Sequence, residues 1–140
     1  MSKFRFHTPI TVSYSDIDAQ WHVNNKVFLD YVETARFQYI QEVGLFDSKS
    51  FLEVPFIVAD VHVKYLAPIE FKDKVVVSMG ITRIGNKSVL MEYEIASADG
   101  AVIFATAETV MVTYDYHKKE SVPVSDEMRK RISDYEGHEF

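Results

Sequence analysis

The strongest constraint on the fold of this chain is a helical pattern over residues 25–43 that is apolar on most of its sides. Apolar side chains recur there at the 3.6-residue period of an α-helix: Val27, Phe28, Tyr31, Val32, Ala35, Tyr39, Ile40 and Val43. Leu29 and Phe37 widen the stripe. Because such a helix must be enclosed by other elements, we expect it at the centre of a domain, with Asn24 as its N-cap and Gly44 just past its end.

Strand-like segments surround this helix. We expect one strand before it, over 4–14, and four after it, over 54–65, 72–84, 89–98 and 102–114. The turn signal Asp99-Gly100 predicts that the last two strands pair antiparallel. A short helix is predicted over 125–135, with Ser125 as its cap. This order predicts a single α+β domain over residues 1–140, with an antiparallel sheet curled about the long helix.

Composition narrows the function. The chain has 140 residues, of which 47% are hydrophobic, a net charge of −6, and no cysteine. The missing cysteines exclude disulfides, a thiol nucleophile and cysteine-based zinc sites. The acidic balance without a basic run argues against nucleic acid as a partner. Neither a signal peptide nor a membrane span is evident in the sequence, so a cytoplasmic protein without a membrane partner is expected.

The polar residues that can carry chemistry gather just before the long helix. They are Asp16, Asp18, His22, Asn24 and Asn25. The N-terminus of a helix offers unpaired N–H groups and the positive end of its dipole, which favours chemistry at this junction. Asp18 could attack a carbonyl, act as a general base, or merely close a loop turn. A metal site at Asp16, Asp18 and His22 is a poor fit, because one histidine with two carboxylates is not a standard zinc pattern.

The motif Asp16-x-Asp18-x-x-x-His22-Val23-Asn24-Asn25, followed by Tyr31-x-Glu33-x-Ala35-Arg36, resembles the acyl-CoA thioesterases of the 4-hydroxybenzoyl-CoA thioesterase type. Tyr65-x-x-Pro68, Asp73 and Ser88 extend the similarity to most of the chain. The resemblance implies the hotdog fold, in which a five-stranded antiparallel sheet wraps a long central helix. It also implies hydrolysis of a small or medium acyl- or aroyl-CoA, without a cofactor or a metal.

The same resemblance assigns roles within the motif. Asp18 matches the family's catalytic carboxylate, as nucleophile or general base, and Asp16 is left to order the loop. The backbone N–H of Asn25 is the candidate donor to the thioester oxygen. The family also implies a homodimer or homotetramer with sites between subunits, and the apolar edge strand 54–65 favours such pairing.

Further residues are candidates for binding the substrate: Trp21, His22, Asn24, Tyr31, Arg83, Lys87 and Ser88. Trp21 stands where the family usually has glycine, and a tryptophan adopts a positive φ only at an energetic cost. Either the loop runs differently in this chain, or Trp21 is kept as a wall of the acyl pocket. The cluster Arg83, Lys87 and Ser88 could hold the phosphates and pantetheine of CoA or form a solvated turn.

Two alternatives remain open. Glu33 and Arg36 are spaced to pair on the helix, as a buried or intersubunit ion pair, although Glu33 could also serve catalysis. The whole domain could instead bind acyl-CoA without turnover, or act as a dehydratase that uses His22 with Asp18.

Overall fold

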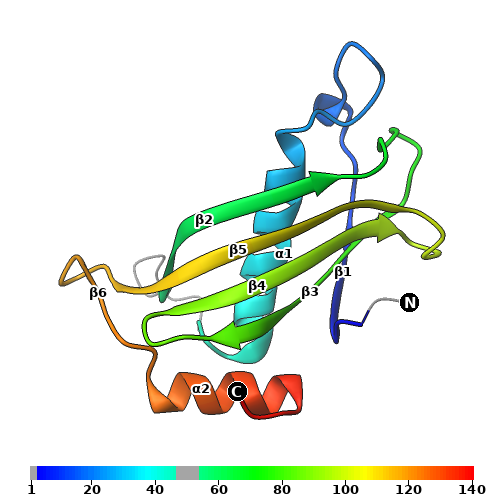
Figure 1. Cartoon of the computed structure of the whole chain (residues 1–140). Coiled ribbons are helices and arrows are strands. Elements are labelled where there is room, and N and C mark those ends of the chain that lie inside the picture. Colours follow the sequence, from blue (N-terminus) through cyan, green and yellow to red (C-terminus); the bar gives the residue numbers. More distant parts are fainter. Residues whose placement is uncertain (1–2, 47–53) are drawn as a thin grey trace.

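The computed structural model describes residues 3–46 and 54–140, which build one antiparallel sheet with a long helix against it (Figure 1). The strands are β1 (Phe6–Ile10), β2 (Phe56–Tyr65), β3 (Val75–Ile84), β4 (Ser88–Ser97), β5 (Ile103–Asp115) and the two-residue β6 (Glu120–Ser121). The helices are the short 3₁₀ helix η1 (Tyr14–Asp16), the long α1 (Val27–Val43) and the C-terminal α2 (Asp126–Glu136).

The sheet has the strand order β1-β3-β4-β5-β2, with β6 added to β5. Every pairing is antiparallel, including the predicted hairpin of β4 and β5. Strands β1 and β2 lie at opposite edges of the five-strand path, so β2 is the long edge strand that the sequence predicts. The α+β hotdog fold is thereby confirmed.

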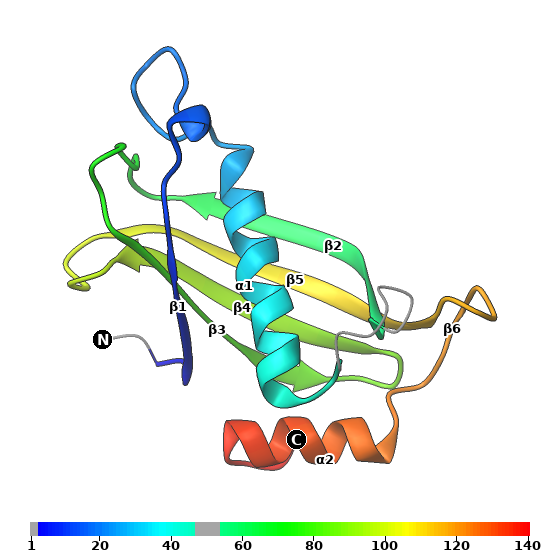
Figure 2. The same cartoon turned by 180° about the vertical axis from the view of Figure 1, so that it is seen from behind.

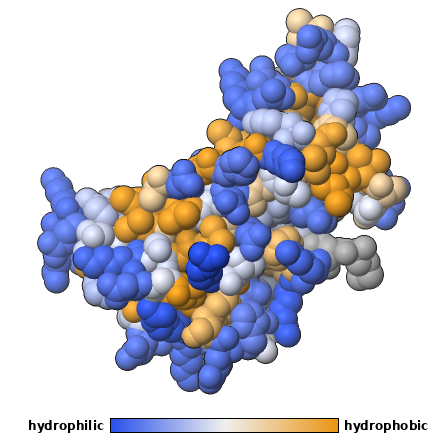
Figure 3. Space-filling view, in the orientation of Figure 1, coloured by the Kyte–Doolittle hydropathy of each residue, from blue (hydrophilic) through white to orange (hydrophobic). Residues whose placement is uncertain are grey.

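Helix α1 lies across one face of this sheet (Figure 2). Eight of its side chains are buried, and they are the eight apolar positions that define the sequence pattern. Alternate residues of the central strands meet them, among them Val77 and Met79 of β3 and Met91 and Ile95 of β4, all almost fully buried. The opposite face of the sheet is in view in Figure 3, where hydrophobic patches interrupt a mainly hydrophilic surface.

The C-terminal end of α1, which we call its closed end, is hydrogen-bonded to α2 and β3. Gly44 adopts a left-handed conformation, with φ of 85°, and ends the helix as predicted. Its carbonyl accepts a hydrogen bond of 3.0 Å from the Arg131 guanidinium of α2. The Tyr39 hydroxyl donates to the Glu136 carboxylate of α2 and also accepts from the Ile81 N–H at 3.2 Å. Helix α2 thus locks this end of α1 to β3.

Two local predictions are wrong. The first strand ends at Ile10 instead of reaching Tyr14, because the carboxylate of Asp16 accepts the Ser13 N–H at 2.8 Å and bends the chain into η1. The N-cap position of α1 falls on Lys26 instead of Asn24. Asn24 instead closes a turn with its side chain, which accepts the Lys26 N–H at 3.1 Å, so α1 begins later than its sequence pattern.

Much of strand β2 is exposed to solvent. Most of its residues after Phe56 are exposed on both faces, including Val58, Val61 and Tyr65. Its register against β5 shifts between Val58 and Asp60, which marks a bulge.

No helix in the described ranges, 3–46 and 54–140, is long and apolar enough to cross a membrane.

Candidate active site

The motif loop before α1 is a small hairpin. Ile17 and Val23 form an antiparallel bridge at its base. The Asp18 N–H donates to the His22 carbonyl at 2.9 Å, and the Asn24 N–H donates to the Asp16 carbonyl at 2.9 Å. The hairpin therefore brings Asp16, Asp18, His22 and Asn24 onto two adjoining segments.

Asp16 orders this hairpin from within. One of its carboxylate oxygens accepts both the Ser13 N–H and the Tyr31 hydroxyl, each at 2.8 Å. Tyr31 is buried in α1, and burial, reinforced by the negative charge of Asp16, raises the pKa of its hydroxyl. The hydroxyl therefore stays a donor at neutral pH. Tyr31, a candidate for substrate binding, is thus placed behind the loop, in contact with Asp16.

Asp18 follows the Ile17–Val23 bridge, opposite His22, and is half-buried. One carboxylate oxygen accepts the Gln20 N–H at 2.8 Å, which is the loop turn considered from the sequence. No residue of the described ranges donates a hydrogen bond to the other oxygen. The turn therefore fixes the side chain and leaves one oxygen available for a substrate or a water molecule.

Trp21 forms the tip of the hairpin. It adopts a φ of 65°, in the left-handed region that favours glycine, and its N–H closes the turn onto the Asp18 carbonyl at 3.0 Å. The loop thus keeps the conformation that a glycine would take, at an energetic cost. The indole side chain is 71% exposed, whereas the neighbouring His22 is half-buried.

The Asn24–Asn25 peptide leads into α1. Its carbonyl accepts the Val27 N–H at 2.9 Å, which fixes the plane of the peptide. Among the described residues, none accepts the N–H of Asn25, which is exposed at the helix N-terminus. An unpaired N–H in this position is the kind of group that can donate to an anion or to a polarised carbonyl.

Sequence reasoning missed one residue that touches this turn. Tyr65, the last residue of β2, donates its hydroxyl to the Asn25 carbonyl at 3.0 Å. Its position in the motif Tyr65-x-x-Pro68 was a signal of importance, but nothing in the sequence spacing linked it to Asn25.

A second group of candidates lies elsewhere in the single chain. Arg83, Lys87 and Ser88 flank the turn between β3 and β4, at the end of the sheet next to α2 (Figure 1). The motif hairpin lies at the other end, beyond the N-terminus of α1. Arg83 and Lys87 are exposed and Ser88 is half-buried. One chain alone therefore does not bring these residues to Asp18.

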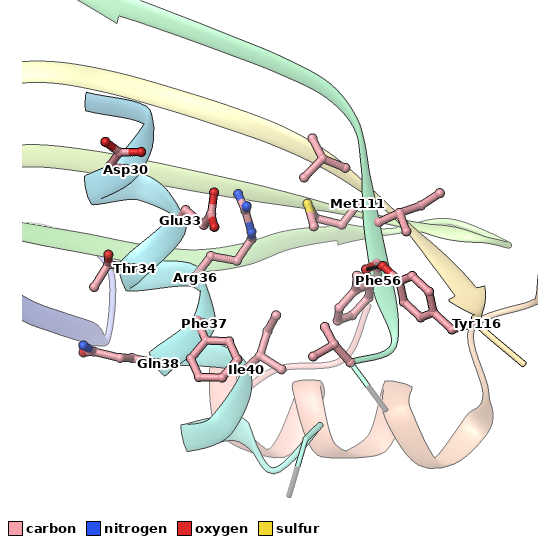
Figure 4. A pocket seen from close by; sticks show the side chains of 13 residues that line it. Asp30, Glu33, Thr34, Arg36, Phe37, Gln38, Ile40, Phe56, Met111 and Tyr116 are labelled. Atoms are coloured by element: carbon pink, nitrogen blue, oxygen red, sulfur yellow. Dashed lines mark hydrogen bonds between the residues drawn. The ribbon is translucent and has the colours of Figure 1, made fainter. Parts of the chain in front are cut away.

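A cleft of about 850 Å³ runs between α1 and the first half of β2 (Figure 4). Apolar side chains form much of its wall: Phe37, Ile40, Val54, Phe56, Ile57, Val58 and Met111. The Glu33 and Arg36 side chains reach into it from α1. Within the described part of the chain they form no ion pair with each other, so the expected pair within one chain is absent. Arg36 lies instead near buried Tyr93, where its charge opposes the rise in pKa that burial causes.

The arrangement of the carboxylates and histidines of the described residues bears on metal binding. Over residues 3–46 and 54–140, no group of three or more such side chains is arranged to hold a metal ion. The loop can therefore offer a carboxylate oxygen, a backbone donor and a helix N-terminus, a set suited to attack on a carbonyl carbon.

Comparison with known proteins shows which family this chain resembles in sequence and in fold. The profile of the Thioesterase-like superfamily matches residues 12–132. The long-chain acyl-CoA thioesterase FadM of Escherichia coli K12 is 22% identical over 125 residues, which cover 89% of this chain and 95% of that protein. A thioesterase from Thermus thermophilus, crystallised with coenzyme A and zinc, superposes with a TM-score of 0.89 and 31% identity over 100% of both chains. A 1,4-dihydroxy-2-naphthoyl-CoA thioesterase from Synechocystis shares the fold, with a TM-score of 0.80 and 21% identity over 92% of this chain and 96% of that one.

The fold, together with these relatives, defines a hotdog-fold thioester hydrolase. Because the family profile spans most of its length, the chain belongs to the thioesterase-like superfamily. The predicted resemblance to hotdog thioesterases is confirmed.

Proposed function

We propose that this enzyme hydrolyses a small or medium acyl- or aroyl-CoA to the free acid and CoA, with Asp18 and the Asn25 N–H at the reacting centre. The observation that carries the proposal is a pair of open groups in the hairpin and the turn that follows it, an available oxygen on Asp18 and, among the described residues, an unpaired N–H on Asn25. The named relatives support CoA as the thiol, since FadM is an acyl-CoA thioesterase and the Thermus enzyme was crystallised with coenzyme A.

The Asn25 N–H would donate to the thioester oxygen and stabilise the negative charge that develops on it. Asp18 would act in one of two ways. As a nucleophile it attacks the carbonyl carbon and releases the CoA thiolate, and water then hydrolyses the mixed anhydride. As a general base it removes a proton from the water molecule that attacks the carbonyl instead. Trp21, His22 and Asn24 lie between Asp18 and Asn25 in the chain and are proposed to contact the substrate. Tyr31 would act through its hydrogen bond to Asp16.

We propose a dimer as the complete unit. Exposed edge strands invite pairing with a second copy, and a two-fold axis makes identical strands pair antiparallel. Each Tyr65 end of β2 would then meet the Phe56 end of the partner strand. Phe56 pairs with Thr113, whose N–H donates to the Lys87 carbonyl at 2.9 Å. Lys87 and Ser88 of one copy would therefore lie at the same end as Asn25 of the other, where, with Arg83, they could bind the phosphates and pantetheine of CoA.

The cleft between α1 and β2 is the proposed place for the acyl group, because its wall is mainly apolar and it opens along the exposed strand. A pairing of Glu33 or Arg36 with the second copy, a tetrameric assembly and a cytoplasmic location stay predictions.

Release of free thiol from acetyl-, octanoyl- and benzoyl-CoA tests the function. We expect Asp18→Asn to lower kcat by about 10²–10⁴-fold, as for loss of a general base or nucleophile. Asp134→Asn, the same change on an exposed residue of α2, is the matched control and should leave kcat unchanged. The proposal fails if the native enzyme releases no thiol from any acyl-CoA, or if Asp18→Asn is as active as the native enzyme.

A further inference from the structure

The helix itself holds the turn that carries Asn25 only weakly. Lys26, at the N-cap position, makes no side-chain capping bond. Among the described residues, the Asn25 carbonyl accepts one backbone N–H, that of Phe28, at 3.3 Å. This bond is longer than the usual 2.9–3.0 Å for backbone groups. The Asn25 carbonyl therefore needs a partner from outside the helix if this peptide is to stay in one orientation.

Tyr65 supplies that partner from the sheet. Its hydroxyl bond to the Asn25 carbonyl, at 3.0 Å, is shorter than the bond within the helix. The backbone of Tyr65 pairs with Ala105 of β5, and its ring packs edge-on against buried Phe28, with 5.0 Å between ring centroids and 74° between the planes. The hydroxyl is thus presented by a side chain that is fixed at both its backbone and its ring.

We propose that Tyr65 is a positioning residue that aims the Asn25 N–H at the thioester oxygen; this inference rests on the function proposed for Asn25. The peptide plane before Asn25 is held by the Val27 N–H, and the plane after it is held by Tyr65. With both planes fixed, the dihedral angles of Asn25 cannot swing, and its N–H keeps one direction. An oxyanion donor stabilises a transition state only when it is preorganised, and small misplacements are costly.

Tyr65→Phe isolates this contribution, because it keeps the ring on Phe28 and removes only the hydroxyl. We expect kcat to fall about 5- to 10-fold, the equivalent of one ordinary hydrogen bond. KM should stay within about twofold, because the donor acts on the developing charge more than on the bound ground state. Stability should change little, because the ring and its contact with Phe28 are kept and a single hydroxyl is lost.

The carbonyl stretch of a bound substrate gives a readout that a structural role alone would not move. Octanoyl-CoA labelled with ¹³C at the thioester carbonyl is bound to Asp18→Asn and to the double variant Asp18→Asn/Tyr65→Phe. A well-aimed N–H lowers the stretching frequency of the carbonyl. We expect the frequency to shift back toward that of free octanoyl-CoA when the Tyr65 hydroxyl is removed.

Tyr39→Phe is the matched control. It also removes a tyrosine hydroxyl bonded to a neighbouring segment, but at the closed end of α1, far from Asn25 along the helix. It should lower stability while leaving both kcat and the carbonyl frequency unchanged.

Three results would overturn the inference: an unchanged kcat in Tyr65→Phe, a loss confined to KM, or a carbonyl frequency that does not respond. Failure of the proposed function looks different, because the native enzyme would then release no thiol from any acyl-CoA. In that case the frequency is compared between the native protein and Tyr65→Phe with octanoyl-CoA bound, and an equal frequency in both refutes the role of Tyr65.

Discussion

The two ends of α1 share one kind of hydrogen bond but differ in whether the polar groups around it are paired. At each end a buried tyrosine of the helix donates its hydroxyl to a carboxylate from another segment, Tyr31 to Asp16 and Tyr39 to Glu136. At the C-terminal end the surrounding groups are paired as well, through Gly44, Arg131 and the Ile81 N–H. At the N-terminal end, which we call the open end, the Asn25 N–H and one Asp18 carboxylate oxygen have no hydrogen-bond partner among the described residues.

Under the proposed function, this difference places the groups needed for stability and those needed for catalysis at opposite ends of one helix. Buried polar groups are normally paired because leaving them unpaired costs free energy. The N-terminal end escapes that cost by keeping Asn25 exposed and Asp18 half-buried, at the edge of the core. Changes at the closed end should therefore lower stability without affecting catalysis, and changes at the open end should do more to the reaction than to the fold.

The largest expected effect on stability comes from the closed end. Ile132 of α2 is fully buried in the main hydrophobic core. Ile132→Ala should lower the free energy of unfolding by about 2–5 kcal/mol, through lost transfer energy and the cavity left behind. The kcat per folded molecule should not change. Denaturant unfolding and thiol release measure the two quantities, and a parallel loss of kcat well below the unfolding transition would contradict the separation of the two ends.

The variants Tyr31→Phe and Tyr39→Phe compare the two ends with the same substitution and a smaller expected loss of stability. Tyr31→Phe and Tyr39→Phe should each lower the free energy of unfolding by about 1–3 kcal/mol, because each leaves a carboxylate short of a donor. Only Tyr31→Phe should also lower kcat, by about 10-fold, because Asp16 then holds the loop of Asp18 and Asn24 less firmly. Equal kcat values in the two variants would show that the loop is held without Tyr31.

Alkaline pH provides a second readout for the same pair. Burial, followed by the bonded carboxylate, raises the pKa of both hydroxyls above the ordinary value of 10.0. The folded protein then keeps protons that the unfolded chain loses above pH 10. Stability should therefore fall as pH rises past 10, by about 1.4 kcal/mol per pH unit for each such tyrosine. Either phenylalanine variant should show a shallower fall, and an unchanged slope would argue against a raised pKa.

Much of the fold followed from local patterns in the sequence. The eight apolar positions of α1 are its eight buried residues, and Gly44 and Ser125 take the capping positions predicted for them. These outcomes depend on periodicity and backbone preference, which act within a few residues. The predicted start of α1 was wrong because the Asn24 side chain accepts the Lys26 N–H in a turn instead of capping the helix.

The site was less predictable because its contacts cross the chain. Neither the bond from Tyr65 to Asn25 nor that from Tyr31 to Asp16 has a signature in residue spacing. Arg83, Lys87 and Ser88 were grouped correctly at one turn, but their distance from Asp18 depends on sheet length and assembly. At Trp21 the family's glycine raised the question of whether the loop runs differently in this chain, and the structure shows that the residue keeps a positive φ.

Trp21 offers the finest test of how the open end is built, through the variants Trp21→Gly and Trp21→Ala. Both remove the indole, but only glycine relieves the strain of a φ of 65°. Trp21→Gly should therefore be more stable than Trp21→Ala by about 1 kcal/mol, the typical cost of such a conformation. At the exposed helical residue Leu29, the same two substitutions should give the opposite order, with glycine less stable by about 1 kcal/mol.

Thiol release by the same two Trp21 variants then separates the side chain from the backbone. If the indole contacts the substrate, both variants should raise KM equally, because both lack it. If the left-handed turn aims Asp18, whose carbonyl the Trp21 N–H contacts, Trp21→Ala should have the lower kcat of the two. Equal stability of the two variants would mean that the hairpin tip relaxes without strain, and the positive φ would then not constrain the open end of α1.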